Sequence, residues 1–288
     1  WKTGGSMPDD RQSSRLSRNF HRTFKPERQY IASMLRFAAS GAEGDIQAIS
    51  EATGIPTGKS SGKVDPTLDY SRGMGLVTVD SSKKGAIRRP HLTMFGRAVL
   101  LDDPFLKLGI SQWIAHFNLC SPVTGADVWY QAFCSGGHSL GMTFSRRQLE
   151  SLLSVVYSVQ SRNLIGPLIG MYEDEAAFRI CGVLAETDGV VQRKIAPVSE
   201  GYSRAYGAWL LQAMQDHFPG REQVSLSDLD AMTGCCRIPG WETETFNQVL
   251  RSIQNKGLIA VDRHMDPWLL RPTADTQAVW KGIYNDLI

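Results

Sequence analysis

The stretch Leu68-Asp-Tyr-Ser-Arg-Gly-Met-Gly-Leu-Val-Thr-Val79 decides the fold, because its pattern recurs without gaps as Leu250-Arg-Ser-Ile-Gln-Asn-Lys-Gly-Leu-Ile-Ala-Val261. In both copies an apolar helix ends on glycine and enters an apolar strand. Gly75 and Gly257 can adopt the left-handed conformation that reverses the chain at a helix end. This order is typical of the third helix and wing of a winged helix-turn-helix, although a generic helix-to-strand junction is the simpler alternative.

Helix and strand signals on either side of each copy complete the same plan twice. In the first third of the chain we expect helices at 26–39, 45–53 and 65–75, with Pro26 at one helix start and Asp65 as the cap of another. A strand at 76–79, a turn at 81–85 and a return strand at 86–89 follow. Near the C-terminus we expect helices at 205–217, 227–232 and 243–256, and strands at 258–261 and 268–271.

The region between the two copies reads as mostly helical. Apolar periodicity predicts helices at 106–118, 125–133 and 145–159, with a loop at 135–141 and an undecided strand or buried helix at 179–184. The predicted class is therefore mainly α (α+β), with tandem winged helix-turn-helix modules flanking a helical middle region. The expected parts are a tag remnant and flexible basic arm (1–18), an N-terminal winged helix (19–101), a helical middle domain (102–201) and a C-terminal winged helix (202–288).

Charge is distributed unevenly along the chain. The net charge is only +2, yet residues 1–97 hold 16 Lys and Arg against 9 Asp and Glu, and the remainder holds 15 against 20. A basic N-terminal third favours a polyanionic partner, here double-stranded DNA. A solvated basic surface is the alternative. The candidate DNA-binding residues lie in the turn before the third helix, on that helix and in the wing: Lys59, Lys63, Arg72, Lys83, Lys84, Arg88 and Arg89.

The C-terminal copy lacks this excess of positive charge. Its basic residues are offset by Glu242, Glu244 and Asp262, and Trp241 stands beside a Pro-Gly pair in its turn. Charge therefore predicts a weaker DNA binder that serves packing or a protein partner.

Composition argues against several other classes of protein. No apolar run approaches the length of a membrane span. Five cysteines without a C-x-x-C pair favour reduced thiols in the cytoplasm over a disulfide framework or a zinc ribbon. Gly58-Lys59-Ser60 is not expected to form a phosphate loop, because Thr53 stands where that motif needs glycine.

No catalytic constellation is visible in the sequence, so the candidates are few. They are His21, Asp102, Asp103 and His116. The Asp102-Asp103 pair follows a helix, where it could bind a cation or cap the next helix. His116 stands among tryptophans and is as easily a core residue as a reactive one.

A series of short motifs runs along the first half of the chain. The motifs are Phe20-His21-Arg22-Thr23-Phe24 with Arg28, Gly58-Lys59, the helix and Gly-Leu of 68–76, Leu92-Thr93-Met-Phe-Gly96, Asp103-Pro104-Phe105-Leu106, Trp113-Ile-Ala-His116 and Trp129-Tyr-Gln-Ala-Phe133. In these motifs and their order, the chain resembles a bacterial family that includes the SspB proteins of DNA phosphorothioation gene clusters. Beyond residue 133 the likeness is vaguer. Arg22 replaces a family glutamate, so no metal or acid–base role of that glutamate is carried over.

The resemblance implies a DNA-binding component of an antiphage modification system that nicks the backbone for sulfur insertion. It also implies partners: a cysteine desulfurase, an ATP pyrophosphatase and an ATPase. Nicking needs an activated water, most simply through Mg²⁺ held by carboxylates, which makes a metal-dependent nicking endonuclease the expected activity. A non-catalytic DNA-binding adaptor or a transcriptional regulator is the alternative that the sequence leaves open.

Overall fold

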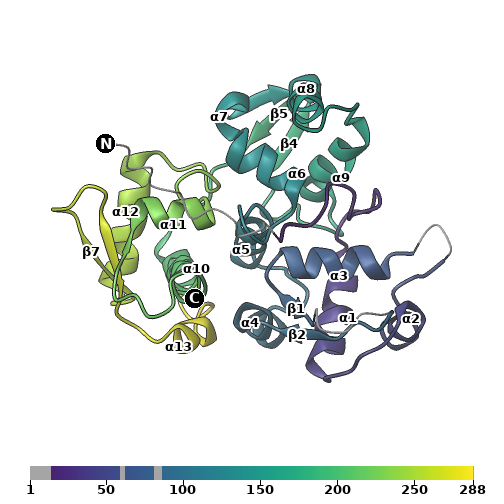
Figure 1. Ribbon diagram of the computed structural model, residues 1–288, viewed down its shortest axis with the longest axis horizontal. Coiled ribbons are helices and arrows are strands. Elements are labelled where there is room, and N and C mark those ends of the chain that lie inside the picture. The colour runs from purple at the N-terminus through teal and green to yellow at the C-terminus, as the bar shows by residue number, and fades with distance from the viewer. Residues whose placement is uncertain (1–13, 59–61, 81–85, 288) are drawn as a thin grey trace, which may run out of the picture.

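The structure, a computed structural model, describes residues 14–58, 62–80 and 86–287 (Figure 1). Helices alternate with small antiparallel sheets, which confirms the α+β class. Within the described ranges, no helix combines the length and the apolar character that crossing a membrane requires. The chain forms three units that follow one another in sequence.

The first unit consists of three helices, a hairpin and a fourth helix. Its elements are α1 (Arg28–Ala39), α2 (Ile46–Thr53), α3 (Val64–Gly73), β1 (Val77–Val79), β2 (Pro90–Leu92) and α4 (Met94–Asp102). The three predicted helices are present, but two of them begin at other residues. Glu27 keeps an extended backbone, so α1 begins after it rather than at Pro26. Asp65 lies inside the first turn of α3 instead of capping it.

The return strand of this unit is β2, at residues 90–92, and not the predicted 86–89. Val77 pairs with Leu92 and Val79 with Pro90, which places a residue without an N–H at the end of the ladder. Arg88, expected in that strand, forms an isolated antiparallel bridge with Gly44 instead. The predicted turn at 81–85 lies outside the described residues.

The middle unit contains a sheet that the sequence reading missed. Its helices are α5 (Gly109–Leu119), α6 (Asp127–Tyr130), which continues as the π-helix η1 (Gln131–Ser135), α7 (Gly137–Leu140), α8 (Arg146–Tyr157) and α9 (Arg162–Glu173). Its strands are β3 (Thr143–Ser145), β4 (Leu184–Thr187) and β5 (Val190–Arg193), which pair in the order β3-β5-β4. The region is therefore not purely helical.

Two more expectations for this unit are wrong. The predicted loop at 135–141 contains the short helix α7, and α9 lies where no element was predicted. The β4–β5 hairpin had a readable signal, because Asp188-Gly189 turns the chain with positive φ at both residues, as tight hairpin turns require. By contrast α8 begins as its sequence suggests, with Ser145 and Gln148 forming a reciprocal capping box.

The C-terminal unit repeats the plan of the middle one. Its elements are α10 (Glu200–His217), β6 (Val224–Ser225), α11 (Leu226–Thr233), α12 (Thr243–Asn255), β7 (Ile259–Asp262), β8 (Leu269–Pro272) and α13 (Thr276–Lys281). The strands pair in the order β6-β8-β7, so the first strand bonds to the last, as β3 does to β5. Ser225, rather than the predicted Ser227, caps α11. The Gly44–Arg88 bridge occupies the corresponding place in the first unit.

The repeat found in the sequence extends to hydrogen bonds at the end of each hairpin. Thr93 donates from its N–H to the Leu76 carbonyl (3.1 Å) and from its hydroxyl to the carbonyl of the preceding glycine (2.6 Å). Thr273 makes the same pair of bonds to Leu258 (3.1 Å) and to the glycine before it (2.9 Å). Both turn glycines have φ near +70°. One local design therefore closes both units.

The two repeated units contact each other through their fourth helices, α4 and α13, at the lower edge of Figure 1. The rings of Phe95 and Trp280 lie 5.3 Å apart across this contact. Above it, α10 packs against α5. The first and C-terminal units are thus held at fixed positions on either side of a central seam.

Candidate nucleic-acid interface

The described basic candidates of the first unit all have acidic partners. Lys63 pairs with Glu27 and lies over two aromatic rings, and Arg89 Nε lies 2.6 Å from Glu43. The pairs on α3 are Arg72 with Asp69 (3.4 Å) and Arg88 with Asp65 (3.1 Å). Lys59, Lys83 and Lys84 lie outside the described residues. The structure thus places Lys63 and Arg72 at and on the third helix as predicted, and Arg88 and Arg89 before the return strand, with all four in ion pairs.

The third helix of the first unit is largely covered. Seven residues of α3 are buried, and its only exposed side chain is Arg72. The segment before α1 lies across it: the rings of Phe20 and Tyr70 are 4.7 Å apart, and the Tyr70 hydroxyl donates to the Phe24 carbonyl (3.0 Å). Burial also raises the pKa of Asp69, an effect that Arg72 opposes. Little of this helix is free to enter a DNA groove.

His21 is buried in the same covering segment. Its Nδ1 accepts the Thr23 N–H (2.9 Å), while its Nε2 is buried without a hydrogen-bond partner in the described structure. Burial lowers the pKa of His21 to about 4, against a smaller opposing effect of the Arg18 carbonyl. His21 is therefore neutral at physiological pH and wedged against Trp129, whose ring is 6.3 Å away.

This burial gives His21 a signature in the pH dependence of stability. Its pKa is about 4 in the folded chain and near the ordinary 6.5 in the unfolded chain. Protonation therefore favours unfolding, and the stabilisation present above pH 6.5 is lost as the pH falls towards 4. We expect this residue to account for about 2 kcal/mol of the loss in unfolding free energy between pH 7 and pH 5.

Urea unfolding of wild type and His21→Gln at both pH values measures this contribution. The variant should lose about 2 kcal/mol less between the two pH values than wild type does. His138→Gln, at an exposed histidine, is the matched control and should leave the difference unchanged. Equal losses in wild type and His21→Gln would contradict the assignment.

The second histidine candidate belongs to a buried polar chain. His116 Nδ1 and the Tyr172 hydroxyl are 2.7 Å apart, and that hydroxyl accepts the Trp129 indole N–H (3.1 Å). Burial, aided by the Arg193 guanidinium, lowers the pKa of His116 well below its ordinary value. Because Trp129 also contacts His21, both histidines flank one tryptophan in the core. Neither imidazole is exposed to a substrate.

The two aspartate candidates lie apart from these histidines, at the end of α4. Asp103 is buried and accepts the backbone N–H groups of Lys107 (2.7 Å) and Leu108 (2.9 Å), which fixes the turn before α5. Asp102 is exposed. Of the two alternatives for this pair, cation binding or ordering of the next helix, the second applies to Asp103.

The one group of three or more metal-ligating side chains among the described residues is not suited to Mg²⁺. It consists of Asp230, Cys235 and Cys236. Its thiols suit softer metals than Mg²⁺, which prefers oxygen ligands. The Asp230 carboxylate also accepts the Cys236 N–H (2.8 Å) and lies 3.4 Å from the Arg237 guanidinium. All five cysteines are free, as expected for reduced thiols.

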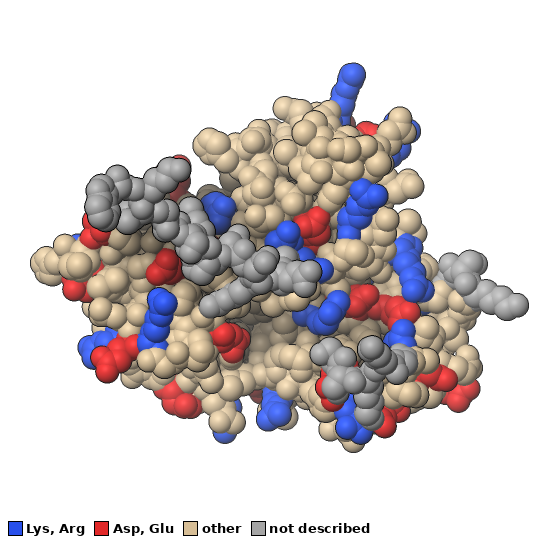
Figure 2. All heavy atoms as spheres, in the orientation of Figure 1, with Lys and Arg blue, Asp and Glu red and all other residues tan. Residues whose placement is uncertain are grey.

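A groove of about 570 Å³ lies in the seam between the first and C-terminal units. Figure 2 shows it as a central hollow, with Lys and Arg mixed with Asp and Glu around it rather than gathered beside it. Its charged lining includes both Arg72 and Asp216. The Trp209 N–H in its wall already donates to Asn118 (3.1 Å). The groove therefore offers no concentrated positive charge for a phosphate backbone.

In sequence, no known protein family and no curated protein matches the chain. In structure, it is similar to two crystal structures of SspB. One has bound magnesium ion, with a TM-score of 0.62 and 16% identity over 97% of this chain and 91% of that one. The other has a TM-score of 0.65 and 16% identity over 96% and 90%. Over nearly its whole length, the chain has the fold of SspB.

Proposed function

We propose that the chain is a DNA-binding component of a phosphorothioation system and that it nicks duplex DNA so that sulfur can be inserted. The observation that carries the proposal is the SspB fold, which extends over 97% of the chain and agrees with the motifs between residues 20 and 133. A cysteine desulfurase, an ATP pyrophosphatase and an ATPase are the proposed partners. Each of them comes from the sequence resemblance.

We further propose that the repeated units are winged helix-turn-helix modules. The support is the order of three helices and a hairpin in both units. In the C-terminal unit a short strand before the second helix pairs with the last strand, and the isolated Gly44–Arg88 bridge takes the corresponding place in the first unit. In helix-turn-helix proteins the recognition helix lies in the major groove, and flanking elements contact the backbone. In the first unit, Lys63, Arg72, Arg88 and Arg89 would exchange their carboxylate partners for phosphates, and Lys59, Lys83 and Lys84 would bind further phosphates.

The proposal includes magnesium because one of the two similar SspB crystal structures contains it. Because the described carboxylates do not assemble a site for it, we assign no residue to the metal and derive no step through it. The buried, hydrogen-bonded state of His21, Asp103 and His116 favours a second candidate, a DNA-binding adaptor without catalysis. The two candidates differ in one measurable outcome.

Supercoiled plasmid incubated with the pure chain distinguishes them. A nickase should convert it to open circles in Mg²⁺ and leave it intact in EDTA, with the activity following the protein through ion exchange and gel filtration. An intact plasmid together with a mobility shift of a labelled duplex would support the adaptor instead. If the plasmid stays intact and no mobility shift is seen even at low salt, both candidates are contradicted.

A further inference from the structure

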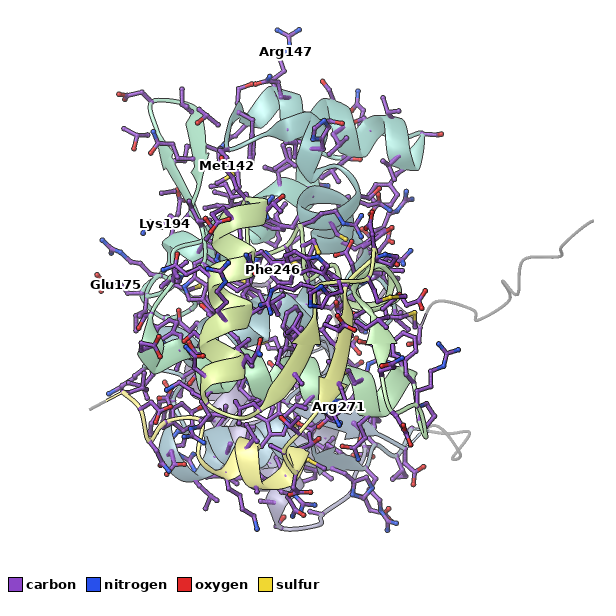
Figure 3. The ribbon with its side chains drawn as sticks, turned by 90° about the vertical axis from the view of Figure 1, so that its left-hand side faces the viewer. Met142, Arg147, Glu175, Lys194, Phe246 and Arg271 are labelled. Atoms are coloured by element: carbon purple, nitrogen blue, oxygen red, sulfur yellow. The ribbon has the colours of Figure 1, made fainter. Side chains whose placement is uncertain are left out.

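One face of α12 is a stripe of exposed polar side chains. Glu244, Gln248, Arg251 and Asn255 recur every three or four residues and are all exposed. The opposite face buries Phe246 and its apolar neighbours in the core of the unit. Figure 3 shows α12 and the β7–β8 hairpin together at the front of the molecule. This helix therefore presents a complete face to solvent.

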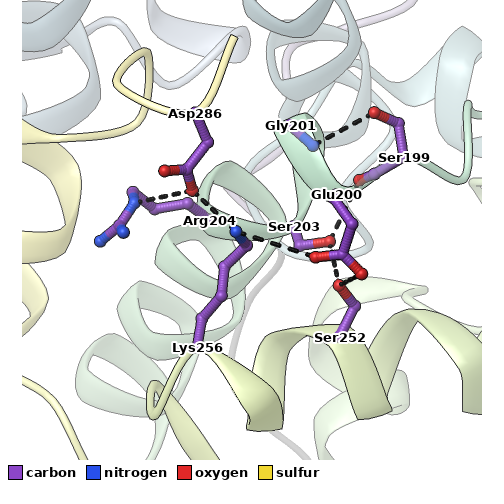
Figure 4. A network of polar contacts seen from close by, with 8 residues as sticks. All are labelled: Ser199, Glu200, Gly201, Ser203, Arg204, Ser252, Lys256 and Asp286. Carbon is purple, nitrogen blue, oxygen red and sulfur yellow. Dashed lines mark hydrogen bonds and ion pairs between the residues drawn. The ribbon is translucent and has the colours of Figure 1, made fainter. Parts of the chain in front are cut away.

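The head groups of this stripe are free, although the helix beneath them is fixed. The side chains of Gln248, Arg251 and Asn255 make no hydrogen bond or ion pair with any other described residue, and they border a hollow of about 240 Å³ beside the start of α10. Two contacts anchor α12 beside this hollow, where Glu200 and Ser252 also form part of its lining (Figure 4). Ser252 donates to Glu200 (2.8 Å), and Lys256 Nζ lies 3.0 Å from Asp286.

The corresponding helices of the other two units present no continuous polar stripe. On α3, Arg72 is the only exposed side chain. On α9, the exposed polar side chains are Arg162 and Asn163 in the first turn and Glu173 at the last residue, and seven residues between them are buried. Of these three helices, α12 is thus the one whose exposed polar side chains recur along its whole length.

We propose that α12 is the helix with which this chain reads base pairs in the major groove. Carboxamides of Gln248 and Asn255 can bond adenine in bidentate fashion, and the Arg251 guanidinium can do so with guanine. This inference rests on the proposed function, since it presumes duplex DNA as ligand. The first unit would then contact phosphates and position the chain on DNA, and α12 of the C-terminal unit would contact base edges and give sequence preference.

The test uses the full chain and a pool of duplexes with randomised sequence. Wild type should enrich a defined site. The triple variant Gln248→Ala/Arg251→Ala/Asn255→Ala should bind that site at least about 100-fold more weakly, since each lost bidentate pair costs roughly 10-fold. Its affinity for a scrambled duplex should stay within about threefold, because phosphate contacts are retained. A double variant at two exposed residues of the fourth helices, Arg97→Ala/Gln277→Ala, is the matched control.

Arg251→Lys adds a readout that a merely structural role would not change. It keeps the charge but loses the bidentate fork, so the preferred base at one position should relax while the others stay fixed. If wild type selects a site and the triple variant binds that site equally well, the inference is overturned but DNA binding is not. A chain that binds no duplex at all would overturn the inference and the proposed function together.

Discussion

Replacing Gly96 by alanine should lower the unfolding free energy by about 3 kcal/mol or more, because the added carbon has no space. Gly96 lies in α4 where the helix crosses β1, and a Cβ there would stand 1.9 Å from the Leu76 carbonyl oxygen. That oxygen accepts the Thr93 N–H at the end of the hairpin. Relief would require moving α4, and with it the packing of Phe95 on Trp280.

Gly166→Ala provides the matched control, since it is also a helical glycine but a Cβ there meets no atom within 4 Å. Alanine has the higher helix propensity, but the ring of Pro167 disfavours a helical backbone at a preceding residue that carries a Cβ, so this variant should stay within about 1 kcal/mol of wild type. Urea unfolding of both variants measures the difference. If Gly96→Ala unfolds at the wild-type midpoint, the close approach of α4 to β1 is wrong.

Arg193→Ala should destabilise the chain by a similar amount through a different cause. Arg193 ends β5 and is buried, and its Nη2 donates to the carbonyl oxygens of Arg237 (2.9 Å) and Ile238 (2.6 Å) in the C-terminal unit. Its guanidinium lies 5.1 Å from the Phe133 ring centroid. Removal leaves two carbonyls without this donor. Since a bond to a charged donor contributes about 1.5–3 kcal/mol, we expect a loss of about 3 kcal/mol.

Two further variants separate this role from a general effect of charge. Arg193→Lys keeps the charge but not the guanidinium fork, so it should fall between wild type and alanine in urea unfolding. Arg147→Ala removes an exposed arginine on α8 and should change the midpoint little (Figure 3). A loss under about 1 kcal/mol for Arg193→Ala would show that other contacts of the same joint suffice. Among these is the bond from the Trp241 N–H to the Ala196 carbonyl (2.8 Å).

The sequence correctly predicted the elements whose formation depends on a few adjacent residues. The helix, Gly-Leu and strand at 68–79 and at 250–261 are present in both units, because a helix end and a left-handed glycine depend on a few adjacent residues. The register of β2, with Pro90 opposite Val79, depends instead on the pairing of two strands that are separated in the sequence. The middle sheet was missed because β3 is only three residues long and finds its partner far along the chain.

The candidate interface likewise combines features that depend on adjacent residues with contacts between distant segments. Sequence placed Arg72 and Arg88 on suitable elements, but it could not show that Asp69 and Asp65 would pair with them. Nor could it show that residues near Phe20 would cover α3, since that contact joins distant segments. Net charge therefore predicted the first unit as the stronger DNA binder, whereas side-chain exposure singles out the stripe of α12. That stripe carries little net charge and was invisible to a count of Lys and Arg.

The pairing of first strand with last governs the order in which the chain can assemble during synthesis. Val224 cannot find Leu270, nor Thr143 its partner Gln192, until the whole unit between them has left the ribosome. Each unit therefore closes only when its hairpin emerges, in succession from the N-terminus. Leu16 is translated before Ala126, to which it bridges in the middle unit, and must wait for it. The cover over α3 therefore cannot be completed before the middle unit begins to emerge.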